Sequence, residues 1–310
     1  TPPVDQAPSL ENVMDRREFL KAAAATAVAA TLNPRRLFAE ESPRAVRVVV
    51  VHGTDAARML SAGIESLGGW QAFVRPGGKT TLKINAAWAA TPEQGANTTP
   101  ALVAAAIRAC RTAGAGAIVL PENPCSPAEK SFQMSGIGAA AQRAGGRLYE
   151  PQAGRDYVTL ELSRGQLLRQ VSVVRDVIET DCLINMPVAK THNGATLTIG
   201  MKNWMGSVRD RGHWHRTGLH QCIADFNTAV RAHVTIVDAT RIMITNGPRG
   251  PGKLEHPNQL ICGTDPVAVD AYAATLFRLQ PFDIPYIQLA HDLGIGCGKL
   301  ADVDVQHLTA

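Results

Sequence analysis

The chain has 310 residues, 45% of them hydrophobic and 19% charged, which is typical of a globular protein with a sizeable core. The formal net charge is +4, no stretch forms a Lys/Arg-dense stripe, and aromatic residues make up 5%. Since nucleic-acid binders carry such a stripe and stack bases on aromatic side chains, we expect no nucleic-acid partner.

The first patterned segment is Asp-Arg-Arg-Glu-Phe-Leu-Lys at 15–21, followed by a weakly apolar run at 22–32. Together they resemble a twin-arginine export signal, and the alternative is a short amphipathic surface helix. The run is shorter than the about 20 apolar residues that cross a bilayer, so we expect no stable transmembrane span. We expect a leader and signal over residues 1–39, the twin-arginine translocase as a partner during export, and a periplasmic or otherwise exported chain.

The export signal also bears on cofactors. The twin-arginine route exports folded proteins, which commonly acquire a cofactor first, so the resemblance makes a metal ion or a metal-containing organic cofactor a candidate. The six cysteines argue against a classical iron–sulfur cluster, because none forms a Cys-x-x-Cys pair. An even count permits disulfides in an exported protein, but Cys110, Cys182 and Cys262 lie in apolar runs typical of buried thiols.

From residue 46 onward, apolar runs of strand length alternate with helical patterns. This alternation predicts an α/β fold with a mainly parallel sheet and flanking helices, in one large domain or two closely packed lobes. We expect strands at 46–52, 80–87, 117–123, 157–163, 170–174, 177–187, 233–240 and 259–265. We expect helices at 55–69, 101–114, 131–145, 220–231, 266–279 and 284–294. Gly and Pro predict loops at 123–130 and 244–257, the latter beside a binding site.

Polar side chains follow several of the expected strands. Ligands bind beyond the carboxyl ends of strands in open α/β sheets, so we expect these side chains to line one cleft. They are Lys83, Asn85, Glu122, Asn123, Lys190, His192, Asn193, Asp238 and Asp265. For Asp265, which directly precedes Pro266, a helix N-cap is favoured instead. A lysine inside an apolar strand, such as Lys83, needs a counter-charge or a bound anion.

The segment 185–215 is dense in glycines, lysines and histidines. We expect Pro187 to end a strand, a loop to hold Lys190 and His192, and Lys202-Asn203 to begin a short helix that points donors at an anion. The alternative is a surface crossover with scattered polar residues.

The motifs of the chain also occur together in a known family. They are, in order, KINAAWA, INMPVAKTH, TLTIGMKNWMG, IADFN, TIVDA, GPRGPG and CGTDPVAVDA. The set resembles the bacterial family known as domain of unknown function 362, and it implies a domain of that type over residues 44–310 with no established activity. Some relatives carry an added ferredoxin segment with clustered cysteines, which this chain lacks.

A weaker resemblance is to the nickel-pincer lactate racemases. A Thr-x-Pro helix start, here at 98–100, precedes a His, a Gly-rich turn and a cofactor-tethering Lys, here His192 and Lys202. The resemblance implies a further metal-ligating histidine, for which His213, His215 and His220 are candidates. The racemases usually carry a His-Arg pair after the earlier strand, and this chain has Glu122-Asn123 there instead.

These observations combine into one hypothesis for the site. His192, Lys190 and Lys202 are the candidate catalytic residues, since imidazole titrates near neutral pH and lysines bind anions. The candidate cofactor-binding residues are Lys83, Asn85, Asn203, Asp238 and Gly250, and the candidate metal ligands are His192, His215 and Asp270. Two functions stay open. One is an exported redox or racemase-like enzyme that holds a metal-containing or anionic ligand, and the other is a non-catalytic periplasmic binding protein for a small anion or metal.

Overall fold

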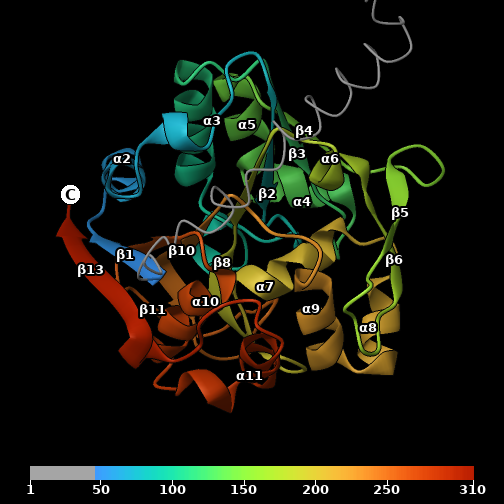
Figure 1. Ribbon diagram of the computed structural model, residues 1–310. Helices are drawn as coiled ribbons and strands as arrows, with labels where there is room; N and C mark the ends of the chain where they lie inside the picture. Colours follow the sequence, from blue (N-terminus) through green and yellow to red (C-terminus); the bar gives the residue numbers. More distant parts are fainter. Residues whose placement is uncertain (1–45) are drawn as a thin grey trace, which may run out of the picture. The chain divides into compact units, whose positions relative to one another are not determined.

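Strand β1 (Val46–His52) shows how the chain is divided between two cores. Val48 and Val50 belong to one buried cluster, whereas Val49 and Val51 belong to another. Successive side chains of a strand point to opposite faces, so a strand buried throughout must be covered on both sides. The computed structural model describes residues 46–310, and Figure 1 shows helices on both faces of the sheet to which β1 belongs.

The main sheet is mixed but mainly parallel, which confirms the predicted fold class. Its central row is, in spatial order, β13 (Val303–Thr309), β1, β12 (Gln259–Gly263), β10 (Val234–Met243), β7 (Cys182–Met186), β2 (Lys79–Ile84), β3 (Ala117–Pro121) and β4 (Arg147–Tyr149). Within this row, β12 pairs antiparallel with both β1 and β10, and all other pairs are parallel. The carboxyl ends of the row, apart from β12, therefore meet at one edge of the sheet.

Three short strands extend the sheet beyond this row. They are β8 (Val188–His192), β9 (Thr196–Thr198) and β11 (Leu254–Glu255). The expectation that Pro187 leads into a loop is wrong. The Pro187 carbonyl accepts the Asp238 N–H at 2.8 Å, and Val188 then pairs with the same strand, β10. The chain thus steps sideways at the proline and continues as strand β8, whose hairpin with β9 contains Lys190 and His192. Strands β5 (Tyr157–Glu161) and β6 (Gln170–Val174) form a separate two-stranded sheet.

Each face of the main sheet has its own set of helices. The helices are α2 (Ala56–Ser66), α3 (Pro100–Thr112), α4 (Ala128–Met134), α5 (Ile137–Ala144), α6 (Arg175–Ile178), α7 (Gly200–Asn203), α8 (Arg211–Thr217), α9 (Leu219–Asn227), α10 (Pro266–Thr275) and α11 (Pro285–Asp292). Buried side chains of α2, α3 and α5 pack with Val49 and Val51, and those of α9, α10 and α11 pack with Val48 and Val50. The predicted helix at 131–145 is two helices, because Gly136 between α4 and α5 has φ 72°.

Two helix starts are held in place by aspartate side chains. Asp265 is the N-cap of α10, as predicted: its Oδ1 accepts the N–H groups of Val267 at 2.8 Å and Ala268 at 2.9 Å. Helix α3 begins at Pro100, but the Thr99 side chain makes no capping bond. Instead, the Thr99 N–H donates to Asp238 Oδ2 at 2.7 Å, which ties the start of α3 to β10.

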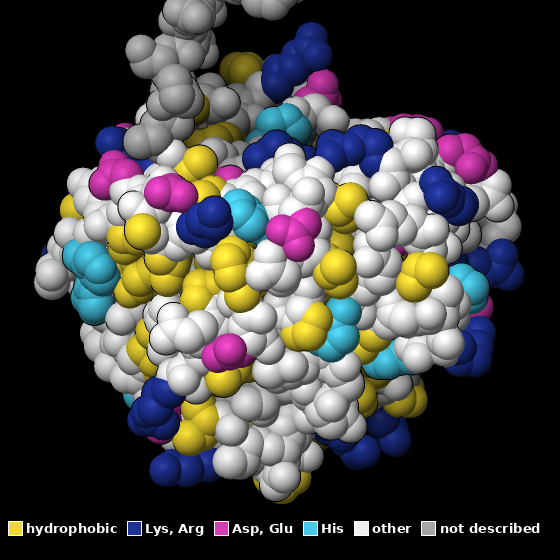
Figure 2. All heavy atoms as spheres, turned by 60° about the horizontal axis from the view of Figure 1, so that its bottom comes forward, with side chains coloured by type: hydrophobic (Ala, Val, Ile, Leu, Met, Phe, Trp, Pro, Cys, Tyr) yellow, Lys and Arg dark blue, Asp and Glu magenta, His cyan; other side chains and the backbone are white. Residues whose placement is uncertain are grey.

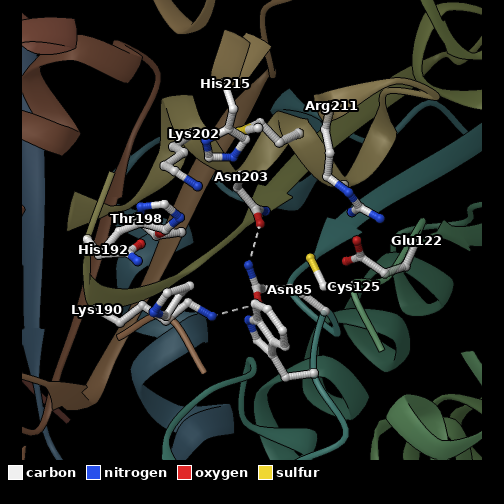
Figure 3. A pocket seen from close by; sticks show the side chains of 16 residues that line it. Asn85, Glu122, Cys125, Lys190, His192, Thr198, Lys202, Asn203, Arg211 and His215 are labelled. Atoms are coloured by element: carbon white, nitrogen blue, oxygen red, sulfur yellow. Dashed lines mark hydrogen bonds between the residues drawn. The ribbon is translucent and has the colours of Figure 1, made fainter. Parts of the chain in front are cut away.

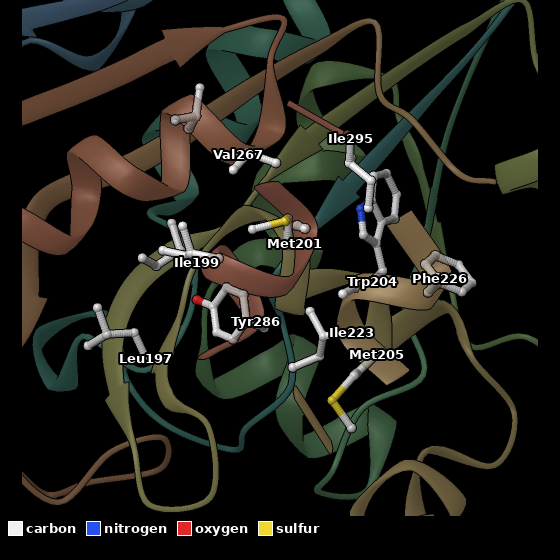
Figure 4. Packing of buried hydrophobic residues seen from close by; sticks show 14 of the residues in the cluster. Leu197, Ile199, Met201, Trp204, Met205, Ile223, Phe226, Val267, Tyr286 and Ile295 are labelled. Carbon is white, nitrogen blue, oxygen red and sulfur yellow. The ribbon is translucent and has the colours of Figure 1, made fainter. Parts of the chain in front are cut away.

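Aromatic and aliphatic side chains hold the segment that follows β9 against α9. Trp204 lies 6.3 Å from Phe226 and Trp214 lies 5.4 Å from it, measured between ring centroids. Met201 and Trp204 are almost fully buried in this cluster (Figure 4). Lys202 lies between them in sequence, so the packing fixes the backbone from which its side chain projects.

The outer surface adds two observations. On the face that includes α11, Figure 2 shows basic and acidic side chains interspersed among uncharged ones, without a continuous basic band. Among residues 46–310, no helix has both the length and the apolar character that crossing a bilayer requires.

Candidate functional site

A cavity of about 290 Å³ lies where β2, β3 and β8 end. Its polar lining includes Asn85 after β2, Glu122 after β3, Lys190 and His192 from β8, and Lys202 at the end of α7. Figure 3 shows Lys190, His192 and Lys202 on one side of the cavity, and Glu122, Cys125 and Arg211 on the other. The sheet therefore brings together side chains that are far apart in the sequence.

Lys202 is a buried cation without a partner. Its exposed fraction is 7%, and its Nζ makes no hydrogen bond or ion pair with any residue of 46–310. Burial lowers the pKa of Lys202 to about 8, the Cys125 thiol opposes this shift, and Arg211 adds to it. The ammonium group therefore faces the cavity with its hydrogen-bonding capacity unused.

Lys190 is also buried but has two partners. Its Nζ donates to Asn85 Oδ1 at 3.2 Å and to the Ala96 carbonyl, and neither acceptor is charged. Burial and the neighbouring Lys202 lower the pKa of Lys190 to about 7. Lys190 is thus much closer to losing its proton at neutral pH than an ordinary lysine.

Lys83 lies beneath the cavity wall and does not line the cavity. Its Nζ donates to Glu122 Oε2 at 2.9 Å, and both side chains are almost fully buried. Burial lowers the pKa of Lys83, and the Glu122 carboxylate opposes this effect. A Cβ on Gly206 would lie 2.1 Å from Glu122 Oε1, so the pair needs a glycine at 206. The counter-charge that Lys83 requires comes from the chain itself.

A chain of amide groups fixes the back of the cavity. Asn85 Nδ2 donates to Asn203 Oδ1 at 3.0 Å, Asn203 Nδ2 donates to Asn185 Oδ1 at 2.8 Å, and Asn185 Nδ2 donates to the Gly200 carbonyl at 2.8 Å. With Asn85 Nδ2 engaged in this way, Asn85 Oδ1 is left to accept from Lys190. The network joins β2, β7 and α7, and it thereby orients Lys190 and Lys202.

His192 is held in one neutral form. Its Nδ1 accepts the N–H groups of Gly194 at 3.0 Å and Ala195 at 3.1 Å, so the ring proton is on Nε2. Burial makes the largest contribution to lowering the pKa of His192 to about 3, and the nearby charges of Lys202 and His215 contribute next. The His215 ring stacks on it with centroids 6.1 Å apart. Near neutral pH, His192 is therefore a hydrogen-bond donor through Nε2.

The ten residues of the site hypothesis, namely the candidate catalytic, cofactor-binding and metal-ligating residues, divide into two groups. Six of them line the cavity: Asn85, Lys190, His192, Lys202, Asn203 and His215. Lys83, Asp238, Gly250 and Asp270 do not. Asp238 binds the start of α3, and a Cβ on Gly250, which has φ 78°, would lie 3.0 Å from Met243 Cε.

Asp270 corrects the expected role of the short helix. Lys202 and Asn203 end α7 rather than begin it. The free N–H groups at its start, those of Gly200 and Met201, donate to the two Asp270 oxygens at 2.8 and 3.0 Å. Burial raises the pKa of Asp270 to about 7, and these two N–H groups oppose the shift. An internal carboxylate thus occupies the position where an anionic ligand was expected.

The metal assignment receives no support from the arrangement of side chains. Within residues 46–310, no group of three or more His, Cys, Asp or Glu side chains is arranged to hold a metal ion.

All six cysteines lie within residues 46–310 and are free. Cys110, Cys182 and Cys262 are buried, which confirms their prediction as core thiols, and Cys125 is exposed.

Several residues that line the cavity were not predicted from the sequence, among them Trp88, Cys125 and Arg211. Cys125 directly follows the strand-end residues Glu122 and Asn123, and this position was the available signal. The Arg211 guanidinium donates to the Asn123 carbonyl at 2.6 Å and the Pro124 carbonyl at 2.5 Å. No local pattern marks such a contact between segments 88 residues apart.

Comparison with known proteins identifies the family. The profile described as Domain of unknown function (DUF362) matches residues 80–275, which include every residue of the cavity lining. The chain therefore belongs to this family, as its motifs predicted. The profile of the twin-arginine translocation pathway signal sequence matches residues 13–32. These residues lie outside the described range, and they mark the chain for export by the twin-arginine route.

Among similar proteins is the thylakoid-associated protein sll1697 of Synechocystis, which is 26% identical over 241 residues, 75% of this chain and 73% of that protein. A solved structure from Thermotoga maritima has a TM-score of 0.43 at 13% identity, covering 73% of this chain and 60% of its own. The lactate racemase apoprotein from Thermoanaerobacterium thermosaccharolyticum, matching the weaker resemblance, has a TM-score of 0.40 at 9% identity, covering 69% of this chain and 55% of its own.

Proposed function

We propose that this exported chain binds a small anion, such as a carboxylate or a phosphate, in the cavity at the strand ends. The observation that supports the proposal most directly is the unpartnered Lys202 ammonium, which is 7% exposed and faces the cavity. Burying a charge without a partner is costly, and a bound anion would supply the missing partner. The site would then be complete only when it is occupied.

The charge balance of the cavity supports the same conclusion. Lys190, Lys202 and Arg211 line the cavity, and Glu122 is the one carboxylate among its lining residues, all of which lie in the described range. Glu122 is already paired with Lys83. The positive charge of Lys202 and Arg211 is therefore available to a ligand, and the Nε2–H of His192 adds a neutral donor. The volume of about 290 Å³ suits a ligand of only a few heavy atoms.

The test is a titration of the purified exported protein with acetate, phosphate and sulfate at constant ionic strength. Calorimetry should detect saturable binding of at least one of these anions at a single site. Lys202→Met should weaken that binding by about 2 kcal/mol, or roughly 30-fold, because a charge-assisted hydrogen bond is lost. It should not destabilise the unliganded protein, because it removes an unpaired buried charge.

The matched control is Lys130→Met. Lys130 is exposed on α4 and does not line the cavity, so this variant should bind anions like the wild type. The proposal fails if no anion binds saturably, or if Lys202→Met binds the anion as tightly as the control.

A further inference from the structure

The geometry points to Lys190 as a nucleophile that forms an imine with a carbonyl group carried by the bound anion, while Lys202 pairs with the anion's charged group. The ligand class would then be 2-oxo acids or similar anionic aldehydes and ketones. This inference rests on the proposed anion binding and adds a covalent step to it. It concerns an amine and a carbonyl only, and it requires no metal or redox partner.

The hydrogen bonds of Lys190 match those of a neutral amine. A neutral amine has two N–H groups and one lone pair. Lys190 Nζ has two acceptors, Asn85 Oδ1 at 3.2 Å and the Ala96 carbonyl, so both N–H groups are satisfied and the lone pair stays free. An ammonium in the same place would have a third N–H without an acceptor among residues 46–310.

The other two buried lysines have different surroundings. Lys83 donates to the carboxylate of Glu122 and is therefore held as an ammonium. Lys202 has no acceptor for any of its three donors in the described part of the chain and is suited to pairing with an anion. The three lysines thus divide into a paired cation, a cation awaiting a ligand, and an amine.

The electrostatic environment of Lys190 favours the same assignment. A lysine is activated as a nucleophile by desolvation and by a neighbouring cation, and Lys190 has both: it is 1% exposed, and Lys202 is close enough to lower its pKa. With that pKa at about 7, a substantial fraction of Lys190 is unprotonated at pH 7.5. The unprotonated fraction of an ordinary lysine at this pH is several hundredfold smaller, on the order of one in a thousand.

The step balances without a co-reactant. The Nζ lone pair forms a bond to the carbonyl carbon, and the π electrons of the C=O bond move to oxygen, which takes up one proton from Nζ. The resulting carbinolamine loses its hydroxyl together with the second Nζ proton as water, leaving a C=N bond. One amine and one carbonyl therefore give one imine and one water. The Nε2–H of His192 lines the same cavity as a donor for the carbonyl oxygen.

Reductive trapping tests this inference. The full chain is incubated at pH 7.5 with glyoxylate or pyruvate and sodium cyanoborohydride, and is then examined by intact mass and peptide mapping. Only an imine is reduced to a stable adduct, so a product from the thiol of Cys125 would not be recorded. We expect one adduct per chain, on Lys190, and slower labelling when acetate competes. Lys130→Met should be labelled like the wild type.

The site of labelling decides the outcome. Lys190→Met should lose the adduct, and peptide mapping of the wild type provides the same information if that variant does not fold. Labelling mainly on Lys202, labelling spread over surface lysines, or no labelling would each overturn the assignment of Lys190. Acetate binding measured by calorimetry tests anion capture separately. If acetate, phosphate or sulfate binds but Lys190 is not trapped, the imine inference fails alone, and if none of the three anions binds, the proposed function fails as well.

Discussion

Three N–H donors of Lys202 face a cavity and have no acceptor within residues 46–310, so the charge on this one residue should govern anion affinity. Its pKa in the unliganded protein is lowered to about 8. A bound anion favours the protonated form and raises this pKa. Well below pH 8 this lysine is charged before and after binding, so Lys202 should add no pH dependence to the affinity there.

Above pH 8 the free protein has lost the Lys202 proton and must take one up to bind, so affinity should fall. The measurement is the dissociation constant of acetate by calorimetry from pH 6 to pH 10, with proton uptake obtained from buffers of different ionisation enthalpy. Lys202→Met should remove most of the pH dependence. Constant affinity up to pH 10 would show that Lys202 does not carry the binding charge.

The Lys83–Glu122 pair makes a different prediction, about stability. Glu122→Gln leaves the Lys83 ammonium buried and removes the carboxylate that stabilises its charge. Breaking a buried pair by removing one partner typically costs about 3–5 kcal/mol, whereas replacing both partners by apolar groups costs much less. Urea unfolding should show this loss for Glu122→Gln and a partial recovery for the Lys83→Met/Glu122→Gln double variant. A loss below about 1 kcal/mol for the single variant would contradict the pairing.

Single residues differ in how much of their role the sequence reveals. Lys83 in an apolar strand predicted a counter-charge or a bound anion, because a buried ammonium must have one or the other. The choice of Glu122 depends on β2 and β3 lying side by side, and the two residues are 39 positions apart. Arg211 shows the opposite case: its contacts with Asn123 and Pro124 arise only after folding, so no spacing predicted it.

At the scale of elements, the four-residue helix α7 determines where Lys202 points. Its first two N–H groups donate to Asp270 on α10, and its last residue, Asn203, is part of the amide network. Asp270→Asn keeps one acceptor oxygen but turns an amide NH2 toward one of the two N–H groups. A buried donor then loses its partner, which typically costs about 1–3 kcal/mol.

The expected result for Asp270→Asn is therefore lower stability in urea together with weaker anion binding, although Asp270 does not line the cavity. Asp292→Asn is the matched control, because Asp292 is exposed at the end of α11. If Asp270→Asn unfolds like the control, the carboxylate does not hold α7 in place.

Elements were predictable where hydrophobic periodicity dominates. The strand at 46–52 has the predicted bounds, and the helices α2, α3, α9, α10 and α11 lie within a few residues of their predictions. The hairpin of β8 and β9 was mistaken for a loop, because Pro187 and the lysines resemble turn residues and because its pairing with β10 is not encoded locally. Strand β13, at the edge of the sheet, was missed although its apolar and polar residues alternate as in a half-exposed strand.

At the scale of the whole molecule, the fold depends on contacts between the two ends of the described chain. Strand β1 lies between β12 and β13, and Val46 pairs with Val303. The α/β class follows from the alternation of elements, but the order of strands does not, since such distant pairings leave no trace in local sequence. Because β1 needs both β12 and β13, the sheet is complete only after the segment 303–309 has been synthesised. This order of events suits a route that exports the folded protein.

Export should therefore depend separately on the signal and on the fold. Replacing Arg16 and Arg17 by lysine should leave a folded protein in the cytoplasm, because the paired arginines define the matched signal. Val50→Asp keeps the signal but places an unpaired charge at a fully buried position, which costs several kcal/mol and should prevent folding before export.

Cell fractionation with protease sensitivity distinguishes the two variants. The double-lysine variant should be cytoplasmic and protease-resistant, and Val50→Asp should be cytoplasmic and protease-sensitive or degraded. Lys130→Met should be exported normally. Unchanged export of the double-lysine variant would rule out the twin-arginine route, and export of the unfolded Val50→Asp chain would show that folding does not precede translocation.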